Sequence, residues 1–256
     1  TVGIMRSICK YAVTVRKRED LARIIHNAFY IAKSGKPGVV VVDIPKDIQL
    51  ALGTDDYPKD INIRGYNPNT SVHMGQVNKA MEILSKAIKP VFLIGGGVNI
   101  AHANELMTKL SEITSVPVVT TMMGKGAIPT THELYVGNIG IHGSYAANTA
   151  IANCDVLFSI GTRFNDRITG KIEEFAKKAT IIHVDIDPAA ISKNISVDIP
   201  IVADAKIAIE AILKKAKKLN IDEWRNQISE WKETHPIKME ESEDILTPEY
   251  IIRKIN

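Results

Sequence analysis

The amino-acid sequence predicts an α/β fold built on a doubly wound parallel sheet. From about residue 72 to 218, apolar runs of strand length alternate with helical periodicities, and the connections between them are short. Units of strand, helix and strand close through right-handed crossovers into a parallel sheet with helices on both faces. At 256 residues, 45% hydrophobic and 24% charged, the chain has the composition of an ordinary globular protein.

The first segment of the chain predicts a helix followed by a strand. Between residues 18 and 34 apolar side chains recur with a helical period, and Gly35 ends the pattern. The run VVVVDIP, residues 39–45, is typical of a strand buried on both faces of a parallel sheet. From about residue 51 to 71 the sequence is rich in Gly, Pro, Asp and Asn, which predicts an interdomain linker.

The central segment, residues 72–218, predicts a single α/β domain. Its expected strands are PVFLIGGG (90–97), VPVVTT (116–121), DVLFSIG (155–161), TIIHVDID (180–187) and IPIVAD (199–204). Its expected helices cover residues 75–88, 102–114, 144–153, about 170–178 and 204–218.

The tail, residues 219–256, is acidic and amphipathic, and we expect a linker there. A new helix start follows at Thr247-Pro248-Glu249. Because the chain begins TVGIMRS without an initiator Met and stops inside a predicted helix, we expect it to be a piece of a longer polypeptide.

Charge and cysteine content argue against several classes of protein. The formal net charge of +3 comes from 32 basic and 29 acidic residues, which is too balanced for a nucleic-acid partner. Cys9 and Cys154 lack the spacing of a metal site or a disulfide scaffold, and the apolar runs are too short for a membrane span. We therefore expect a cytoplasmic protein with no nucleic-acid or membrane partner.

In a doubly wound sheet, ligands bind outside the carboxyl ends of the strands, so residues at those positions are the candidates. Gly95–Gly97 either let a ligand approach the backbone or form a tight turn, and Ile100 replaces the third glycine of a GxGxxG motif. Thr121 offers a hydroxyl group. Met122 and Met123 either present polarizable surface to a flat ring or fill an uneven core.

The segment IGTRFNDRITG, residues 160–170, places several charges directly after an apolar strand. Arg163 and Arg167 can bind phosphate or carboxylate through paired donors, and Asp166 can orient them. The alternative is that Asp166 caps the next helix and both arginines are solvated.

Three further positions complete the edge. His142, between two glycines at a helix start, is more simply a loop residue than a catalytic one. Asp185 ends a strand where dinucleotide folds place an acid against ribose hydroxyls, and Asp204 closes the last strand in the same layer. Asp187-Pro188 is expected to be a cap and first helical residue, and His183 to point into the core. Together the strand ends predict a site for a dinucleotide.

Four motifs resemble one family. GKPGVVVVDIPKDIQ, TTMMGKGAIP, NIGIHGSYAAN and GTRFNDRITG are similar to the large, catalytic subunits of acetolactate synthase, also called acetohydroxyacid synthase, and the resemblance runs over essentially the whole chain. This family belongs to the thiamine-diphosphate-dependent enzymes. The match departs at Asn165, where the family usually has aspartate, so the resemblance carries no charged group to this position.

The resemblance implies three α/β domains in the full-length protein. Residues 1–50 would end the pyrimidine-binding domain, 51–71 would be a linker, 72–218 the central FAD-binding domain, and 219–256 the linker and start of the diphosphate-binding domain. The cofactors implied are FAD in this region, and thiamine diphosphate with Mg²⁺ in the full-length protein.

The resemblance also assigns site residues. Substrate binding is carried over to Arg167 and Lys10. FAD contacts are carried over to Arg64, Gly95, Gly96, Gly97, Thr121, Met122, Met123, Ile139, Gly140, Ile141, His142, Gly161, Thr162, Arg163, Asp166, Asp185, Ile186 and Asp204.

The activity implied is the condensation of two 2-oxo acids, pyruvate or 2-oxobutyrate as the second, with loss of CO₂. The family's catalytic glutamate and its GDG…N metal motif have no counterpart in this chain, so no catalytic residue is assigned and we expect this chain alone to be inactive. The family implies a homodimer or homotetramer, to which a regulatory small subunit can bind. The alternatives are a related enzyme, such as glyoxylate carboligase or pyruvate oxidase, and a stand-alone nucleotide-binding module.

Overall fold

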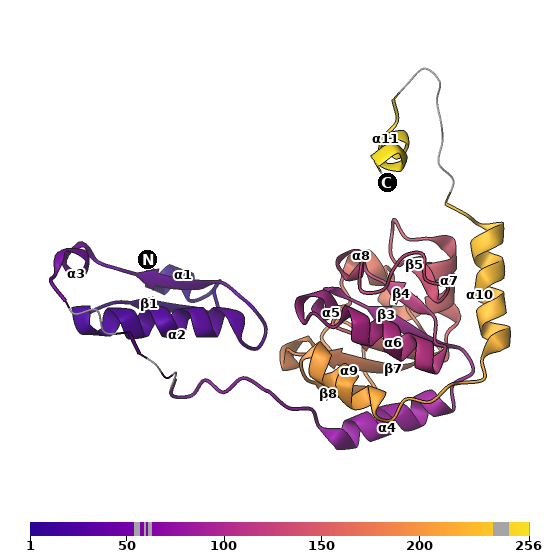
Figure 1. The fold of residues 1–256 in the computed structure, drawn as a ribbon, viewed down its shortest axis with the longest axis horizontal. Coiled ribbons are helices and arrows are strands. Elements are labelled where there is room, and N and C mark those ends of the chain that lie inside the picture. The colour runs from indigo at the N-terminus through magenta and orange to yellow at the C-terminus, as the bar shows by residue number, and fades with distance from the viewer. Residues whose placement is uncertain (54–56, 59, 61–62, 238–245, 256) are drawn as a thin grey trace. The chain divides into compact units, whose positions relative to one another are not determined.

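A computed structural model of the protein describes residues 1–53, 57–58, 60, 63–237 and 246–255. The chain divides into two compact units, Thr1–Ser71 and Val72–Asn256 (Figure 1). The domain identities expected from the resemblance remain predictions.

The first unit contains a small parallel sheet. Strands β1 (Tyr11–Thr14) and β2 (Val40–Asp43) pair in register, and helix α2 (Leu21–Lys33), preceded by a 3-10 turn at Arg18–Asp20, packs on them. The predicted helix and strand are therefore both present, whereas β1 was not predicted. The short helices α1 (Val2–Met5) and α3 (Lys46–Leu50) complete the described part of this unit.

Burial of strand β2 differs from the prediction. Its four residues are half-buried rather than buried on both faces. The physical reason is that this sheet has two strands in the described part of the unit, and its core is a small cluster around Val15, Ile24 and Ile48.

The second unit confirms the predicted doubly wound parallel sheet. Six parallel strands lie in the order β5-β4-β3-β6-β7-β8. They are β3 (Pro90–Ile94), β4 (Val118–Thr120), β5 (Tyr135–Asn138), β6 (Val156–Ile160), β7 (Thr180–Asp185) and β8 (Ile199–Val202). The chain winds outward from β3 to β5, returns to the centre at β6, and winds outward again on the other side.

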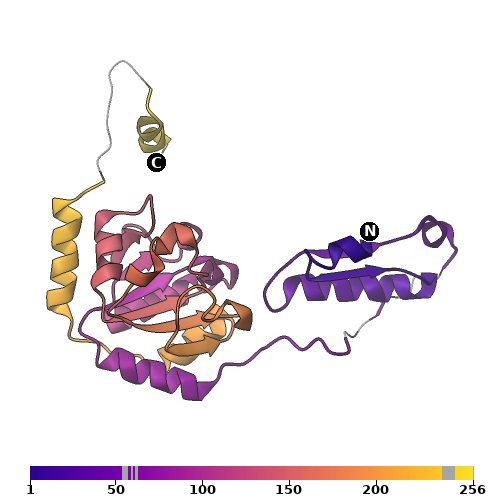
Figure 2. The same cartoon turned by 180° about the vertical axis from the view of Figure 1, so that it is seen from behind.

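Helices flank this sheet, as Figures 1 and 2 show from opposite sides. They are α4 (Met74–Ser85), α5 (Gly96–Ile100), α6 (Asn104–Thr114), α7 (Tyr145–Asn153), α8 (Asp166–Thr169), α9 (Ala205–Leu213) and α10 (Asp222–Thr234), and α11 (Pro248–Ile255) follows near the end of the chain. Helix α9 contacts both α4 and α6, while α7 contacts α10.

The central strands form the core. Every residue of β3 and β6 is buried, and the rings of Phe92 and Phe158 meet edge to face with centroids 5.6 Å apart. A fully buried side chain of this size contributes about 1.5–3 kcal/mol to folding. The continuous apolar runs that predicted these strands are thus explained by burial on both faces.

Three elements differ from the sequence-based prediction. The glycines after β3 open helix α5 instead of extending the strand. Strand β5 was not predicted, because YVGN is short and contains Gly137, whose φ is +148°. In place of the helix expected around 170–178 there is a 3-10 turn at Ile172–Glu174, and the short helix α8 before it ends at Gly170, whose φ is +56°.

The tail also differs from the expected linker, because helix α10 packs on the sheet unit. Trp224 is 2% exposed, belongs to the core cluster, and donates from its indole nitrogen to the carbonyl oxygen of Pro90 (3.1 Å). At the other end of the helix, the rings of Tyr145 and His235 stack with centroids 3.9 Å apart. The packed unit therefore extends beyond residue 218.

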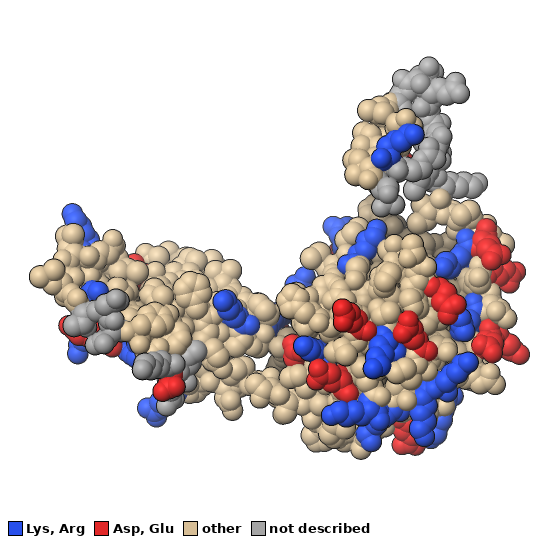
Figure 3. Space-filling model, in the orientation of Figure 1, with Lys and Arg blue, Asp and Glu red and all other residues tan. Residues whose placement is uncertain are grey.

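The surface carries charges of both signs, and the two cysteines form no disulfide. Acidic and basic side chains are interspersed over the face of the second unit drawn in Figure 3. Cys9 and Cys154 are free, and burial raises the pKa of the Cys154 thiol to about 12. None of the helices that the structure describes is both long and apolar enough to cross a bilayer.

Replacing Trp224 with alanine should lower the free energy of unfolding by about 3–5 kcal/mol, because the change leaves a cavity beneath α10. The matched control is Trp231→Ala on the same helix, where the ring is only partly buried and the loss should be smaller. Urea denaturation followed by circular dichroism measures both. An unchanged midpoint for the Trp224 variant would show that α10 is not part of the packed unit.

Candidate functional site

The two central strands define the point where the sheet reverses its winding. Strands β3 and β6 are neighbours, and the chain leaves them toward opposite halves of the sheet. Ligands of doubly wound folds bind in the crevice outside the carboxyl ends of two such strands. The predicted segments Gly95–Gly97 and Gly161–Arg163 follow β3 and β6, so the structure brings them together at this edge.

The two glycine-containing loops touch through their backbones. Gly95 N donates to the carbonyl oxygen of Ile160 (2.9 Å), and Gly97 N to that of Gly161 (3.0 Å). A Cβ atom built on Gly95 would lie 2.2 Å from the Gly161 oxygen, and one on Gly97 would lie 2.7 Å from the Gly161 Cα. Gly161 itself has a φ of +66°. Packing between the loops therefore requires these glycines, as in the tight-turn alternative of the sequence analysis.

The loop after β4 lies against the same place. Thr121 accepts a hydrogen bond from Gly124 N (3.1 Å) and so caps the 3-10 turn Met122–Gly124. A Cβ atom on Gly96 would lie 3.0 Å from the Met123 Cβ. Met122 and Met123 are 67% and 73% exposed, which excludes the alternative that they fill the core.

The loop after β5, the strand beyond β4 in the sheet order, lies at the same edge. Ile139 is buried, whereas Ile141 and His142 are exposed. Gly140 has a φ of +113°, and Ile141 N donates to the carbonyl oxygen of Arg167 (3.2 Å). The predicted residues of this loop thus lie beside the segment that follows β6.

Asn148 holds this loop in place. Its role was not predicted from the sequence. Its side-chain oxygen accepts from Gly140 N (3.0 Å) and its amide donates to Gly140 O (3.1 Å). The position lies within helix α7, eight residues beyond the glycine, and no local pattern in the sequence distinguishes it from other exposed helical asparagines.

The charged side chains after β6 are accessible to a ligand. Arg163 is exposed, and the side chains of Asp166 and Arg167 are 82% and 76% exposed, with a loose contact between them (3.9 Å). The residue that caps α8 is Asn165, which makes no side-chain capping bond. The alternative in which Asp166 is the cap is therefore wrong, although both arginines are solvated as it expected.

The acidic residues at the next two strand ends already accept backbone hydrogen bonds. Asp185 is 8% exposed and accepts from Asp187 N (2.8 Å). Asp204 caps helix α9 and accepts from Lys206 N (2.9 Å). Asp187 caps a 3-10 turn that starts with Pro188, which confirms that prediction. Contacts of Asp185, Ile186 and Asp204 with ribose or phosphate remain predictions.

His183 points into the core, as predicted. Its side chain is fully buried, and Nε2 donates to the carbonyl oxygen of Thr162 (2.8 Å). Burial lowers the pKa of His183, although the Thr162 carbonyl and the Asp185 carboxylate, 3.8 Å from Nε2, act in the opposite direction. The imidazole is therefore neutral and ties strand β7 to the loop after β6.

Two predicted residues belong to the first unit. Arg64 is exposed in a turn. The Lys10 ammonium group donates to the carbonyl oxygens of Ile31 (2.6 Å), Ser34 and Lys36 (2.9 Å), and so caps the end of α2. Because an ammonium group has three donors, these contacts engage all of them. The expected role of Lys10 in substrate binding remains a prediction.

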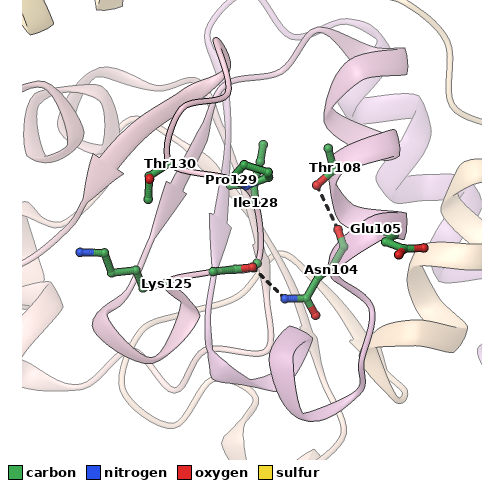
Figure 4. A pocket seen from close by; sticks show the side chains of 9 residues that line it. Asn104, Glu105, Thr108, Lys125, Ile128, Pro129 and Thr130 are labelled. Carbon is green, nitrogen blue, oxygen red and sulfur yellow. Dashed lines mark hydrogen bonds between the residues drawn. The ribbon is translucent and has the colours of Figure 1, made fainter. Parts of the chain in front are cut away.

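A separate surface pocket of about 480 Å³ lies between the first turn of α6 and the loop 125–130 (Figure 4). Asn104 crosses between these elements by donating to the carbonyl oxygen of Gly126 (2.8 Å), and Thr108 donates to Asn104 O (3.1 Å). None of the predicted site residues lines this pocket.

Comparison with known proteins identifies the family. Residues 77–212 match the family model described as "Thiamine pyrophosphate enzyme, central domain". The chain belongs to the thiamine pyrophosphate enzymes. The match covers the sheet unit from helix α4 to helix α9, so the edge described above belongs to the central domain of a thiamine pyrophosphate enzyme.

Among individual proteins, the chain is similar to acetolactate synthases. It is 39% identical to the acetolactate synthase large subunit of Buchnera aphidicola subsp. Acyrthosiphon pisum, over 99% of this chain and 46% of that protein. It is 41% identical to the acetolactate synthase of Mycobacterium bovis, over 99% and 42%. It is 37% identical to the acetolactate synthase isozyme 3 large subunit of Escherichia coli K12, over 99% and 46%. The chain thus spans less than half the length of these relatives.

The described residues of this thiamine pyrophosphate enzyme contain no group of three or more His, Cys, Asp or Glu side chains placed to hold a metal ion. The polar groups at the edge are exposed arginines, backbone groups of glycine loops, and carboxylates that accept backbone hydrogen bonds. This set can bind anionic groups and sugar hydroxyls.

The buried histidine predicts a pH dependence of stability. Since the folded-state pKa of His183 is lowered, the unfolded chain takes up a proton that the folded chain does not as the pH falls through 6.5. The free energy of unfolding should then decrease toward low pH by at most about 1.4 kcal/mol per pH unit from this group. His183→Gln should flatten this part of the curve in urea titrations at pH 5–8, whereas parallel curves for the two proteins would contradict the prediction.

Proposed function

We propose that this chain is part of the large subunit of an acetolactate synthase. The full-length protein would condense two 2-oxo acids, with decarboxylation of the first, to 2-acetolactate or 2-aceto-2-hydroxybutyrate in valine, leucine and isoleucine synthesis. Support comes from the relatives of that name, 37–41% identical over 99% of the chain. Because the chain spans less than half of those relatives, the catalytic glutamate and the metal motif are assigned to other parts of the protein.

We propose that the edge beside β3 and β6 holds FAD. The observation that carries this is the meeting of three glycine-containing loops at the winding reversal, with exposed Arg163, Met122 and Met123 around them. The arginine matches a phosphate, the methionines match a flat ring, and the carboxylate of Asp185 matches ribose hydroxyls. Backbone groups of Ile139–His142 and of Gly161–Thr162, with Asp166, Ile186 and Asp204, would complete the site. A contact of Arg64 with FAD stays a prediction from the resemblance.

Thiamine diphosphate, bound with Mg²⁺ by other parts of the protein, supplies the carbanion chemistry of the reaction. The proposed role of this chain's residues is to bind and orient FAD and the second 2-oxo acid. Arg167 is proposed to receive the carboxylate of the second 2-oxo acid, since its side chain is 76% exposed and its own carbonyl oxygen anchors the 139–142 loop. Lys10, whose donors are engaged at the end of α2, is the second residue that the resemblance proposes for substrate binding.

Partners and location follow from the same proposal. The substrates would be pyruvate and 2-oxobutyrate, the assembly a homodimer or homotetramer that can bind a regulatory small subunit, and the compartment the cytoplasm. Glyoxylate carboligase and pyruvate oxidase are the alternatives of similar fold. A stand-alone nucleotide-binding module is the alternative of a different class.

Titration of the chain with FAD, NAD and ADP tests the ligand. FAD should bind most tightly, and Arg163→Ala should weaken it at least about tenfold, the effect of losing a charge-assisted hydrogen bond. Arg23→Ala, an exposed arginine of the first unit paired with Asp20, is the matched control and should leave the dissociation constant unchanged. Preferential binding of NAD would favour the stand-alone module.

Product analysis of the full-length protein tests the reaction. With pyruvate, thiamine diphosphate, Mg²⁺ and FAD it should form 2-acetolactate, whereas the 256-residue chain alone should form none. Arg167→Ala in the full-length protein should raise the KM for the second 2-oxo acid. Condensation of glyoxylate in preference to pyruvate would point to a carboligase, and turnover by the chain alone would overturn the assignment of the catalytic residues to other parts.

A further inference from the structure

Three successive carbonyl groups after β6 each accept a hydrogen bond from a side chain. His183 Nε2 donates to Thr162 O (2.8 Å), and the Asn194 side-chain amide donates to both Arg163 O (3.1 Å) and Phe164 O (3.0 Å). Both donors come from the β7 half of the sheet unit, 21 to 31 residues further along the chain. The backbone around Arg163 is therefore held by the side chains of His183 and Asn194, and the arginine side chain takes no part in these bonds.

The conformation held in this way is one that the local sequence does not favour. Phe164 has a φ of +49°, in the left-handed region that bulky residues rarely adopt, and its side chain is 2% exposed. Its ring meets His183 (4.8 Å between centroids) and Phe175 (6.0 Å) edge to face. Such a backbone persists only where the surroundings over-determine it, and strained residues of this kind concentrate at ligand sites.

The imidazole of His183 has a defined chemical state. A carbonyl oxygen only accepts hydrogen bonds, so Nε2 carries the proton and Nδ1 of the neutral ring is an acceptor. Within the described residues, Nδ1 has no hydrogen-bond partner, and neither has the buried hydroxyl of Ser159. Ser159 and His183 are register partners on β6 and β7, so their side chains stand on the same face of the sheet. The single hydrogen bond of the ring, from Nε2 to Thr162 O, therefore sets its tautomer.

We propose that His183 and Asn194 are positioning residues, which fix the Thr162–Phe164 loop so that Arg163 is presented at the sheet edge before any ligand arrives. The identity of the ligand rests on the function proposed above, whereas the fixing of the loop does not. A site whose polar groups are locked in advance by surrounding bonds loses less conformational entropy on binding.

Hydrogen–deuterium exchange of the ligand-free chain tests the fixing of the loop. His183→Leu and Asn194→Leu, which remove the donors, should accelerate exchange in residues 161–170 at least tenfold and leave β3 and β4 protected. His183→Gln keeps an amide donor and should restore most of the protection. Asn226→Leu, at an exposed asparagine of α10, is the matched control and should change nothing at the loop. Unchanged exchange in both donor variants would overturn the proposal, and so would failure of glutamine to differ from leucine.

The unmodified side chain gives a second measurement that holds even where a variant fails to fold. Imidazole nitrogen NMR should show His183 as the neutral tautomer protonated at Nε2 from pH 8 to below 6.5. A ring protonated at Nδ1, or one that titrates at its usual pKa, would overturn the proposal.

Ligand binding separates this inference from the function on which it partly rests. If FAD binds, its dissociation constant should rise at least tenfold in the two leucine variants and recover with His183→Gln. Failure of the unmodified chain to bind FAD, NAD or ADP would count against the proposed function, while the exchange and NMR measurements still decide whether His183 and Asn194 fix the loop.

Discussion

The candidate site depends on a contact between two backbones. The loop that leaves β3 and the loop that leaves β6 meet with no side chain between them, joined by the bond from Gly97 N to Gly161 O (3.0 Å). Any Cβ atom at Gly95 or Gly97 would enter the space of the Gly161 backbone. Because the other loops of the edge pack against these two, a shift at this contact would move the whole ligand-binding edge.

The polar groups of the edge divide into two kinds. Thr121, Asp185 and Asp204 accept backbone hydrogen bonds, so they shape the loops in which they lie. The side chains of Arg163 and Arg167 are exposed. Their backbone carbonyl groups, by contrast, accept hydrogen bonds from Asn194 and from Ile141 N. This arrangement leaves the charged ends available while the backbone beneath them is rigid, which favours recognition of an anionic ligand without large rearrangement.

The central strands could be predicted from the sequence because burial on both faces selects long apolar β-branched runs, as in the strand that contains Phe158. Strand β5 could not, since its three-residue ladder with β4 leaves little periodicity to detect. The strand-end rule placed Arg163 and Asp185 correctly at one edge. It could not find Asn148 or Asn194, because their bonds join segments 8 to 31 residues apart. The hydrogen bonds of Lys10 could not be predicted either, because its carbonyl partners lie more than 20 residues away.

Helix α10 determines where the chain goes after the sheet unit. In its first turn, Trp224 donates a hydrogen bond to Pro90, at the amino end of β3. Directly after its last turn, His235 stacks on Tyr145, the first residue of α7, on the carboxyl side of β5. Thirteen residues of helix span about 20 Å, which is enough to cross the height of the sheet. The helix therefore crosses from the amino end of the sheet to its carboxyl end, and it finishes at the same edge as the loops that carry the two arginines.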